Sequence, residues 1–307
     1  MKLRVCKYND NEGKLSRSIE YHLIIMDDKR EEEHRMIQFQ NEHFTVFESQ
    51  LYKTTSVVVK TKDCIIVVDP NLLPKEVEDI RNKVNKIKGN LPIYVIYTHS
   101  DWDHLIGSGA FLDATVIASH LFSKLDQHHI LEQMKQFDDK YYLDRNYPIS
   151  FPQVDIPISR ERHTAKIGGT TLTFYQAPGH TADGIFAVIE PLGILIAGDY
   201  LSDVEFPFIY DSSFHYDLTL QKVDTILTNH RIQYLIPGHG HMASNTEEIR
   251  KRKEESKNYI QELRNSIKLN SDSHHLISHY PYWRELSFSH EDNIALIKRE
   301  LNNQQKK

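Results

Sequence analysis

The chain has 307 residues, and its 37 Lys and Arg against 43 Asp and Glu give a formal net charge of −6. A mildly acidic chain has no overall positive field to hold a nucleic-acid backbone, so nucleic acid is not an expected partner. Hydrophobic residues make up 39 % of the chain and aromatic residues 10 %, which is enough for a core and excludes general disorder. No segment approaches the roughly 20 consecutive apolar residues that a membrane span needs, so no membrane contact is expected.

Cysteine usage and the N-terminal segment predict where the protein works. Cys6 and Cys64 are too few for a disulfide scaffold in a chain of this length, and they fit a reducing compartment. The first ten residues contain no apolar run of signal-peptide length. We therefore expect a soluble cytoplasmic protein.

The first half of the chain begins with a charged extension and continues with strands. Two strand-like pieces, residues 21–26 and 36–40, lie in an N-terminal extension (residues 1–43) that we expect to pack on the core. Short runs rich in β-branched residues then predict buried strands, because such runs with polar breaks between them are typical of a sheet. These strands fall at residues 44–47, 56–59 and 65–68. A helix is predicted over residues 74–86, with Pro74 in its first turn.

The remaining elements alternate between strands and helices. Strands are predicted over residues 93–97, 116–118, 171–176 and 234–236, with a hairpin formed by residues 185–189 and 194–197. Helices are predicted over residues 121–142, 216–228, 246–268 and 291–303.

This alternation predicts an α/β fold in which two packed sheets are flanked by helices. The sequence has no internal repeat and no low-complexity linker, which favours one catalytic domain (residues 44–245) with appendages. Residues 246–307 are charged and helical in pattern, and we interpret them as a helical C-terminal extension.

Four of the predicted strands end in side chains that bind metal ions. An apolar strand delivers such a side chain rigidly to one rim of a sheet, as a site on a firm scaffold requires. Imidazole and carboxylate groups together suit Zn²⁺, iron or Mn²⁺. The side chains are His99, Asp101, Asp103 and His104 after the first of these strands, then His180, Asp199 and His239 after the others.

The spacing within the first group favours two neighbouring metal positions. His99 and Asp101 are two residues apart, so they point the same way and can share one ion. Asp103 and His104 are adjacent, and we expect them to diverge towards a second position as the chain enters a helix at Leu105.

The order H-x-D-x-D-H, G-H, G-D and G-H resembles the metallo-β-lactamase superfamily of dinuclear hydrolases, over roughly residues 44–245. The resemblance implies an αββα sandwich with the active site at one edge. It also implies a ligand set of two metal positions joined by a bridge. His99, Asp101 and His180 would hold one metal, Asp103, His104 and His239 the other, and Asp199 would bridge them.

The same resemblance implies a reaction class. In this superfamily a metal-bridging hydroxide attacks a carbonyl or phosphorus centre, and the second metal stabilises the oxyanion or the leaving group. Asp199, as the bridge, and Asp103, assisting the leaving group, would be the catalytic side chains. The upstream V-V-D-P run is similar to the first motif of the family, so Asp69 is expected to orient the metal ligands without binding a metal itself.

Asp101 departs from the common family pattern, in which this position is a second His. Two divalent ions with Asp103 and Asp199 carry a net charge of about +2, and adding Asp101 lowers it to about +1. A less positive site favours harder ions. Two divalent ions are thus expected, zinc by resemblance, with iron or manganese as alternatives because of Asp101. A carboxylate near this position also resembles the iron-binding flavodiiron branch, although no flavin domain is readable here.

An aromatic segment follows Asp199 directly. It either lines the mouth of the substrate site or packs the next helix onto the sheet. In the first case Tyr200, Phe208 and Tyr210 are the candidate substrate contacts. Ser212 and Ser213 indicate the cap of that helix.

These observations predict a metal-dependent hydrolase of a small ester, lactone or thioester. The acyl-homoserine lactonases have a Tyr three residues after the bridging Asp, where this chain has Ser202, and the loop after Asp199 is unlike that of the glyoxalase II thioesterases. The alternatives are a metal-dependent phosphodiesterase or nuclease and, from a different class, a di-iron redox or oxygen-binding protein. The expected partner is a small-molecule substrate, and a homodimer is left open.

Overall fold

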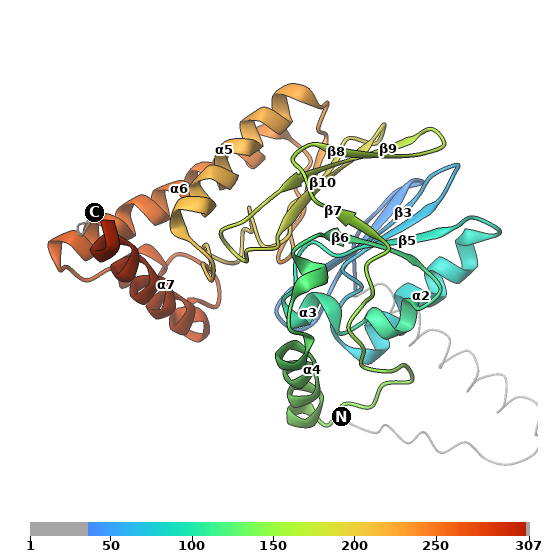
Figure 1. The fold of residues 1–307 in the computed structure, drawn as a ribbon, viewed down its shortest axis with the longest axis horizontal. Helices are drawn as coiled ribbons and strands as arrows, with labels where there is room; N and C mark the ends of the chain where they lie inside the picture. Colours follow the sequence, from blue (N-terminus) through green and yellow to red (C-terminus); the bar gives the residue numbers. More distant parts are fainter. Residues whose placement is uncertain (1–35, 305–307) are drawn as a thin grey trace, which may run out of the picture.

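The computed structural model describes residues 36–304 (Figure 1). The strand predicted over residues 21–26 and the position of Cys6 lie outside the described residues. The next predicted strand is present as β1 (Ile37–Gln40), which pairs with β2 at the edge of the first sheet.

The first sheet has seven strands in the order β1 to β7. Its first four strands are antiparallel neighbours, and β4 to β7 are parallel. The strands after β1 are β2 (Phe44–Glu48), β3 (Thr55–Lys60), β4 (Ile65–Val68), β5 (Ile93–Ile96), β6 (Thr115–Ser119) and β7 (Ile156–Ile158).

The second sheet has five strands in the order β12-β11-β10-β9-β8. Its strands pair antiparallel, except that β11 and β12 are parallel. They are β8 (His163–Ile167), β9 (Thr170–Gln176), β10 (Ile185–Glu190), β11 (Ile194–Ile196) and β12 (Tyr234–Ile236). The short strands β7 and β8, at an edge of each sheet, are not part of the sequence-based prediction.

Side chains alternate between the two faces of each strand, as a pleated strand requires. In β4, Ile66 and Val68 join the core between the two sheets, whereas Ile65 and Val67 face the helices outside. In β9, Phe174 likewise faces the other sheet and Tyr175 faces outward. Both faces of each sheet are therefore buried, and the molecule needs a helical layer on each outer side.

Helices supply these two outer layers. The face of the first sheet is covered by α2 (Pro74–Lys88), α3 (Trp102–Leu105) and α4 (Gln127–Tyr141). The face of the second is covered by α5 (Ser213–Asn229) and α6 (Thr246–Leu269), and α7 (Trp283–Gln304) packs against α6. Short 3₁₀ turns lie at η1 (Ser108–Phe111), η2 (Phe122–Lys124) and η3 (His274–Leu276). The predicted αββα sandwich with C-terminal helices is confirmed (Figure 1).

Several helix ends differ from the sequence-based prediction. The helix predicted from residue 121 begins as α4 at Gln127, because the Asp126 side chain accepts a hydrogen bond from His128 N and caps it there. The last helix begins at Trp283, eight residues earlier than expected. The helix after the first ligand group begins at Trp102 rather than at Leu105. Ser212 caps α5, as predicted.

Among the helices of residues 36–304, none combines the length and the apolar composition that a membrane span requires.

Candidate metal centre

Five strands of the two sheets end at one edge of the sandwich. β4 and β5 are parallel, and β9, β11 and β12 share one direction because β9 and β11 both run antiparallel to β10. The loops after these five strands meet there, as the contacts between their side chains show. They carry Asp69 after β4, the His99–His104 segment after β5, His180 after β9, Asp199 after β11 and His239 after β12.

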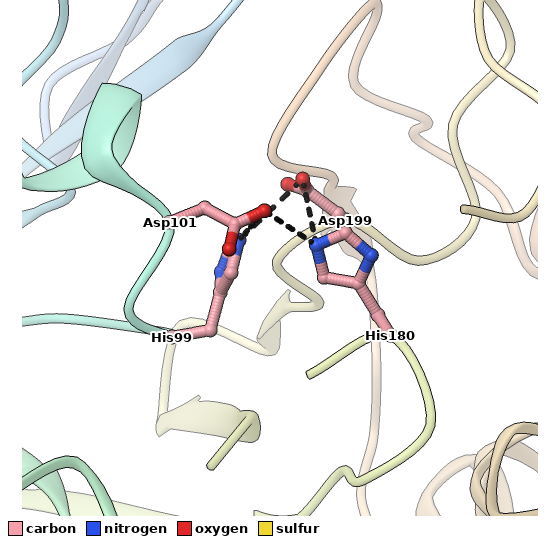
Figure 2. A group of neighbouring side chains, drawn as sticks. All are labelled: His99, Asp101, His180 and Asp199. Atoms are coloured by element: carbon pink, nitrogen blue, oxygen red, sulfur yellow. Dashed lines mark ion pairs between the residues drawn. The ribbon is translucent and has the colours of Figure 1, made fainter. Parts of the chain in front are cut away.

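One group of four side chains comes together there. Single ligand atoms of His99, Asp101, His180 and Asp199 all lie within 4.8 Å of one another. The His180 imidazole points between the two carboxylates, with Nε2 at 3.2 Å from Asp101 Oδ2 and 3.2 Å from Asp199 Oδ2 (Figure 2). His99 Nε2 is 3.8 Å from the same Asp101 oxygen. His99 and Asp101 thus face one common point.

A second group lies beside the first. Asp103, His104 and His239 are buried, and one ligand atom of each lies within 4.8 Å of the others. His104 Nε2 is 3.2 Å from His239 Nε2, and Asp103 Oδ2 is 3.4 Å from His239 Nε2. Asp101 and Asp103 diverge into different groups, as the spacing predicts.

Asp199 contacts both groups. Its Oδ1 is 3.1 Å from His104 Nε2, while its Oδ2 is 3.2 Å from His180 Nε2 and 3.5 Å from His239 Nε2. Gly238 allows this approach, because a Cβ there would lie 2.1 Å from Asp199 Oδ1. One carboxylate therefore lies between the two clusters.

All four imidazoles are oriented in the same way. In each, Nδ1 meets an oxygen atom of the surrounding protein, so that Nε2 faces the centre. A histidine that binds metal usually donates its other N–H to such an oxygen, which fixes its tautomer. The contacts are His99 to Thr98 Oγ1 at 2.9 Å, His104 to Asp69 Oδ2 at 3.1 Å, His180 to the Phe208 carbonyl at 2.9 Å and His239 to the Tyr52 carbonyl at 2.7 Å.

The charges of the site favour a cation. Burial opposes charging His104, yet the carboxylates of Asp199 and Asp103 raise its pKa well above the ordinary value. Burial also opposes charging His239, and Glu205 and Asp199 raise its pKa to about 10. Nearby histidines hold the pKa of Asp199 well below its usual range despite its burial.

The residues present fit two metal ions. The Nε2 atoms of His99 and His180 are buried and make no hydrogen bond of good geometry, although carboxylate oxygens lie 3.2 to 3.8 Å away. In the second group two imidazole nitrogens face each other at 3.2 Å. Buried polar atoms without partners are unfavourable unless another group satisfies them. Two divalent ions would satisfy them with nitrogen and carboxylate ligands, a donor set that suits zinc, iron or manganese.

In the aromatic segment after Asp199, some side chains pack within the protein and one lies beside the candidate metal centre. Tyr200, an expected substrate contact, is only 2 % exposed; its hydroxyl accepts from His180 N at 3.0 Å and donates to the Pro178 carbonyl at 2.9 Å. Both of these hydrogen bonds are made with the loop that carries His180. The Phe208 ring packs edge-on against Phe206. Tyr210 is 48 % exposed, and its ring centroid lies 5.1 Å from that of His180.

The structure adds residues that sequence reasoning missed. Glu205 Oε1 lies 3.7 Å from His239 Nδ1, and burial raises the pKa of this carboxyl to about 7 against the opposing charge of His239. Asp183 is buried and accepts a hydrogen bond from Ser100 at 3.0 Å. Neither follows a strand in the pattern of the ligands, so no sequence signal marks them.

An aromatic wall borders the second group. We use this name for Tyr52, Trp102, Phe137 and Tyr141, whose rings lie 4.8 to 6.3 Å apart along the series. Trp102 immediately precedes Asp103, and the Tyr52 carbonyl meets His239. The wall and Tyr210 thus stand beside different candidate metal positions.

An αββα sandwich with two His/Asp clusters at one edge defines a metal-dependent hydrolase. The model of the metallo-beta-lactamase superfamily matches residues 50–254. The chain belongs to this superfamily, as the resemblance of its motifs implies.

Solved structures share the fold at low sequence identity. A metallo-beta-lactamase family protein from Thermus thermophilus aligns with a TM-score of 0.56 and 18 % identity, over 76 % of this chain and 84 % of its own. The stereoselective inverting sec-alkylsulfatase from a Pseudomonas species aligns with a TM-score of 0.58 and 13 % identity, over 76 % of this chain but only 42 % of its own. No curated protein matches the chain. These likenesses establish the fold and leave the substrate open.

Proposed function

We propose that the protein hydrolyses a small carboxylic ester, lactone or thioester at a two-metal centre. The charge of the ligand set supports this class of substrate. Three carboxylates would reduce two divalent ions to a net charge of about +1. Among residues 36–304, no Lys or Arg forms an ion pair with Asp101, Asp103 or Asp199. A phosphodiester brings its own negative charge, so a neutral carbonyl group suits this centre better.

The proposed roles follow the two clusters. His99, Asp101 and His180 would hold one metal ion, and Asp103, His104 and His239 the other. Asp199 would set the separation of the two positions, since its two oxygens face both clusters. When bound, the metal ions would supply an activated water and a Lewis acid for the carbonyl.

Other side chains would orient the substrate. Partial burial, reinforced by the negative charge of Asp101, raises the pKa of Tyr210, so its phenol stays protonated and can donate a hydrogen bond. Asp103 would assist departure of the leaving group. Tyr52 and Trp102 of the aromatic wall and the Phe208 side chain would contact the apolar part of the substrate. Zinc is the metal we propose, in a cytoplasmic enzyme.

The test is a substrate panel with matched metal analysis. Protein purified without chelators or a His-tag would be assayed for metal content and then for hydrolysis of aryl esters, lactones, thioesters, a phosphodiester and a sec-alkyl sulfate. We expect two equivalents of metal per chain and turnover of the carbonyl substrates. Asp199→Asn should bind less metal and lose at least about 100-fold in kcat/KM, because metal activation contributes several kcal/mol.

Two outcomes would contradict the proposal. Faster turnover of the phosphodiester or the sulfate than of any carbonyl substrate would move the protein to another hydrolase class. Two equivalents of iron with visible absorbance and no hydrolysis would favour the di-iron redox alternative.

A further inference from the structure

Residues 207–212, which we call the 207–212 segment, lie directly against the loop that carries His180. The Phe208 carbonyl accepts a hydrogen bond from His180 Nδ1 at 2.9 Å. In the other direction, Tyr210 N donates to the His180 carbonyl at 2.8 Å, and Ser212 N donates to Gly179 O at 3.3 Å. The orientation of the His180 imidazole therefore depends on where this segment lies.

Asn293 of α7 holds the segment on both sides of Phe208. Its Nδ2 donates to the Pro207 carbonyl at 2.6 Å, and its Oδ1 accepts from Ile209 N at 2.9 Å. The side chain is fully buried, with 0 % exposure. Because one planar amide engages the backbone before and after Phe208, it fixes the direction of the Phe208 carbonyl.

The Asn293 amide is itself locked by a buried polar network. Its Nδ2 also donates to Tyr259 Oη at 2.9 Å, and that hydroxyl lies 2.8 Å from His290 Nδ1. His290 Nε2 lies 2.9 Å from Ser273 Oγ. All four side chains are buried, so each depends on its neighbours for hydrogen bonds.

A second contact from α7 holds the end of the segment. Glu300 accepts a hydrogen bond from Ser212 Oγ at 2.7 Å and another from Ser213 N at 3.1 Å, where α5 begins. The start of α5 and the 207–212 segment are thus attached to one helix, α7, which is drawn in red beside α6 in Figure 1. This helix lies beyond residues 50–254, the part matched by the superfamily model.

We infer that Asn293 is a positioning residue for the metal centre, through which α7 orients the His180 imidazole and sets the metal affinity of the first cluster. The inference rests on the proposed role of His180 as a metal ligand. Groups that orient a metal-binding histidine typically change metal affinity by about 10- to 100-fold when they are removed. Here the group that touches the histidine is a backbone carbonyl, so Asn293 is the side chain through which it can be altered.

The test is a Zn²⁺ titration of metal-stripped protein against a chromophoric chelator. Asn293→Ala and the nearly isosteric Asn293→Asp would be compared with Leu296→Ala, a buried apolar change in the same helix. We expect both Asn293 variants to bind one of the two zinc equivalents at least about 10-fold more weakly and the other unchanged. Leu296→Ala should lose thermal stability while keeping both affinities. If Asn293→Ala does not fold, the comparison is made with Asn293→Asp alone.

Two results would overturn the inference. One is an Asn293→Asp variant that binds both equivalents as tightly as the parent protein. The other is a Leu296→Ala variant that weakens zinc binding as much as the Asn293 variants do. His180→Ala, titrated alongside, separates the two proposals. If it keeps both equivalents, the ligand role of His180 fails; if it loses one while Asn293 variants lose none, only the positioning role fails.

Discussion

The Asp69 carboxylate lies 3.1 Å from Nδ1 of His104, across 35 residues of sequence. Asp69 also accepts hydrogen bonds from Thr98 N at 2.9 Å and from Thr98 Oγ1 at 2.6 Å. The turn after β4 is thereby connected to the loop after β5 and to the first residues of α3. His104 is held so that its Nε2 faces Asp199 at 3.1 Å. A side chain outside both clusters thus determines how one of them is arranged.

Replacing Asp69 with Asn should weaken metal binding at the second cluster. The backbone of Asp69 is left-handed, with φ 41°, a conformation that Asn tolerates, so the fold should persist. The amide lacks the charge that makes His104 a better ligand, and we expect an affinity loss of about 10-fold or more. Calorimetric titration with Zn²⁺ measures it. Asp113→Asn, which removes a surface partner of Arg81, is the matched control; equal effects of the two changes would contradict the prediction.

The ligand groups were predictable because each follows an apolar strand. Strand direction then brings His180 and His239 to one edge without further information. The atoms that orient these two histidines were not predictable. They are the backbone carbonyls of Phe208 and Tyr52, which every residue possesses, so no side chain marks them.

Two further differences between the sequence-based prediction and the structure have local physical causes. Tyr200 follows Asp199 directly, but its side chain points away from that of Asp199, and its ring enters the outer core beside Tyr216. The start of α7 was missed because Ser289 and His290 are buried polar residues, which interrupt the apolar period used to recognise a helix. His290 belongs to the network that holds Asn293, and only tertiary contacts reveal it.

Replacing Asp101 with His should shift the metal preference towards zinc. Asp101 Oδ2 lies 3.2 Å from His180 Nε2, in the first cluster. An imidazole there removes one negative charge and supplies a softer nitrogen ligand, which favours Zn²⁺ over Mn²⁺. Competition titrations of the two ions, in parent and variant, measure the ratio of affinities. An unchanged ratio would show that the carboxylate does not determine the selectivity.

Replacing Tyr210 with Phe should lower catalysis and leave metal binding intact. The ring stays beside His180, so packing is kept, and only the phenolic donor is lost. A neutral hydrogen bond contributes about 0.5–1.5 kcal/mol, so kcat/KM should fall about 2- to 10-fold. Steady-state kinetics on the best ester of the panel, with metal content checked, gives the answer. Unchanged kinetics would remove Tyr210 from the substrate site.

The stability of the metal-stripped protein should fall as pH rises. Burial disfavours the charged form of His239, but Glu205 and Asp199 raise its pKa from 6.5 to about 10. A pKa raised in the folded state stabilises that state fully below the unfolded value, and the contribution is lost as pH rises through the folded value. The contribution of His239 to stability should therefore be lost between pH 6.5 and about 10.

Thermal melts of chelator-treated protein across this window would measure the effect. His239→Gln should show a flatter dependence on pH, because its side chain does not titrate. Zinc-loaded protein should show the opposite trend, since metal ions compete with protons for the same imidazole nitrogens and bind more tightly as pH rises. Metal-stripped protein that gains stability between pH 6.5 and 10 would contradict the charge distribution assigned to the site.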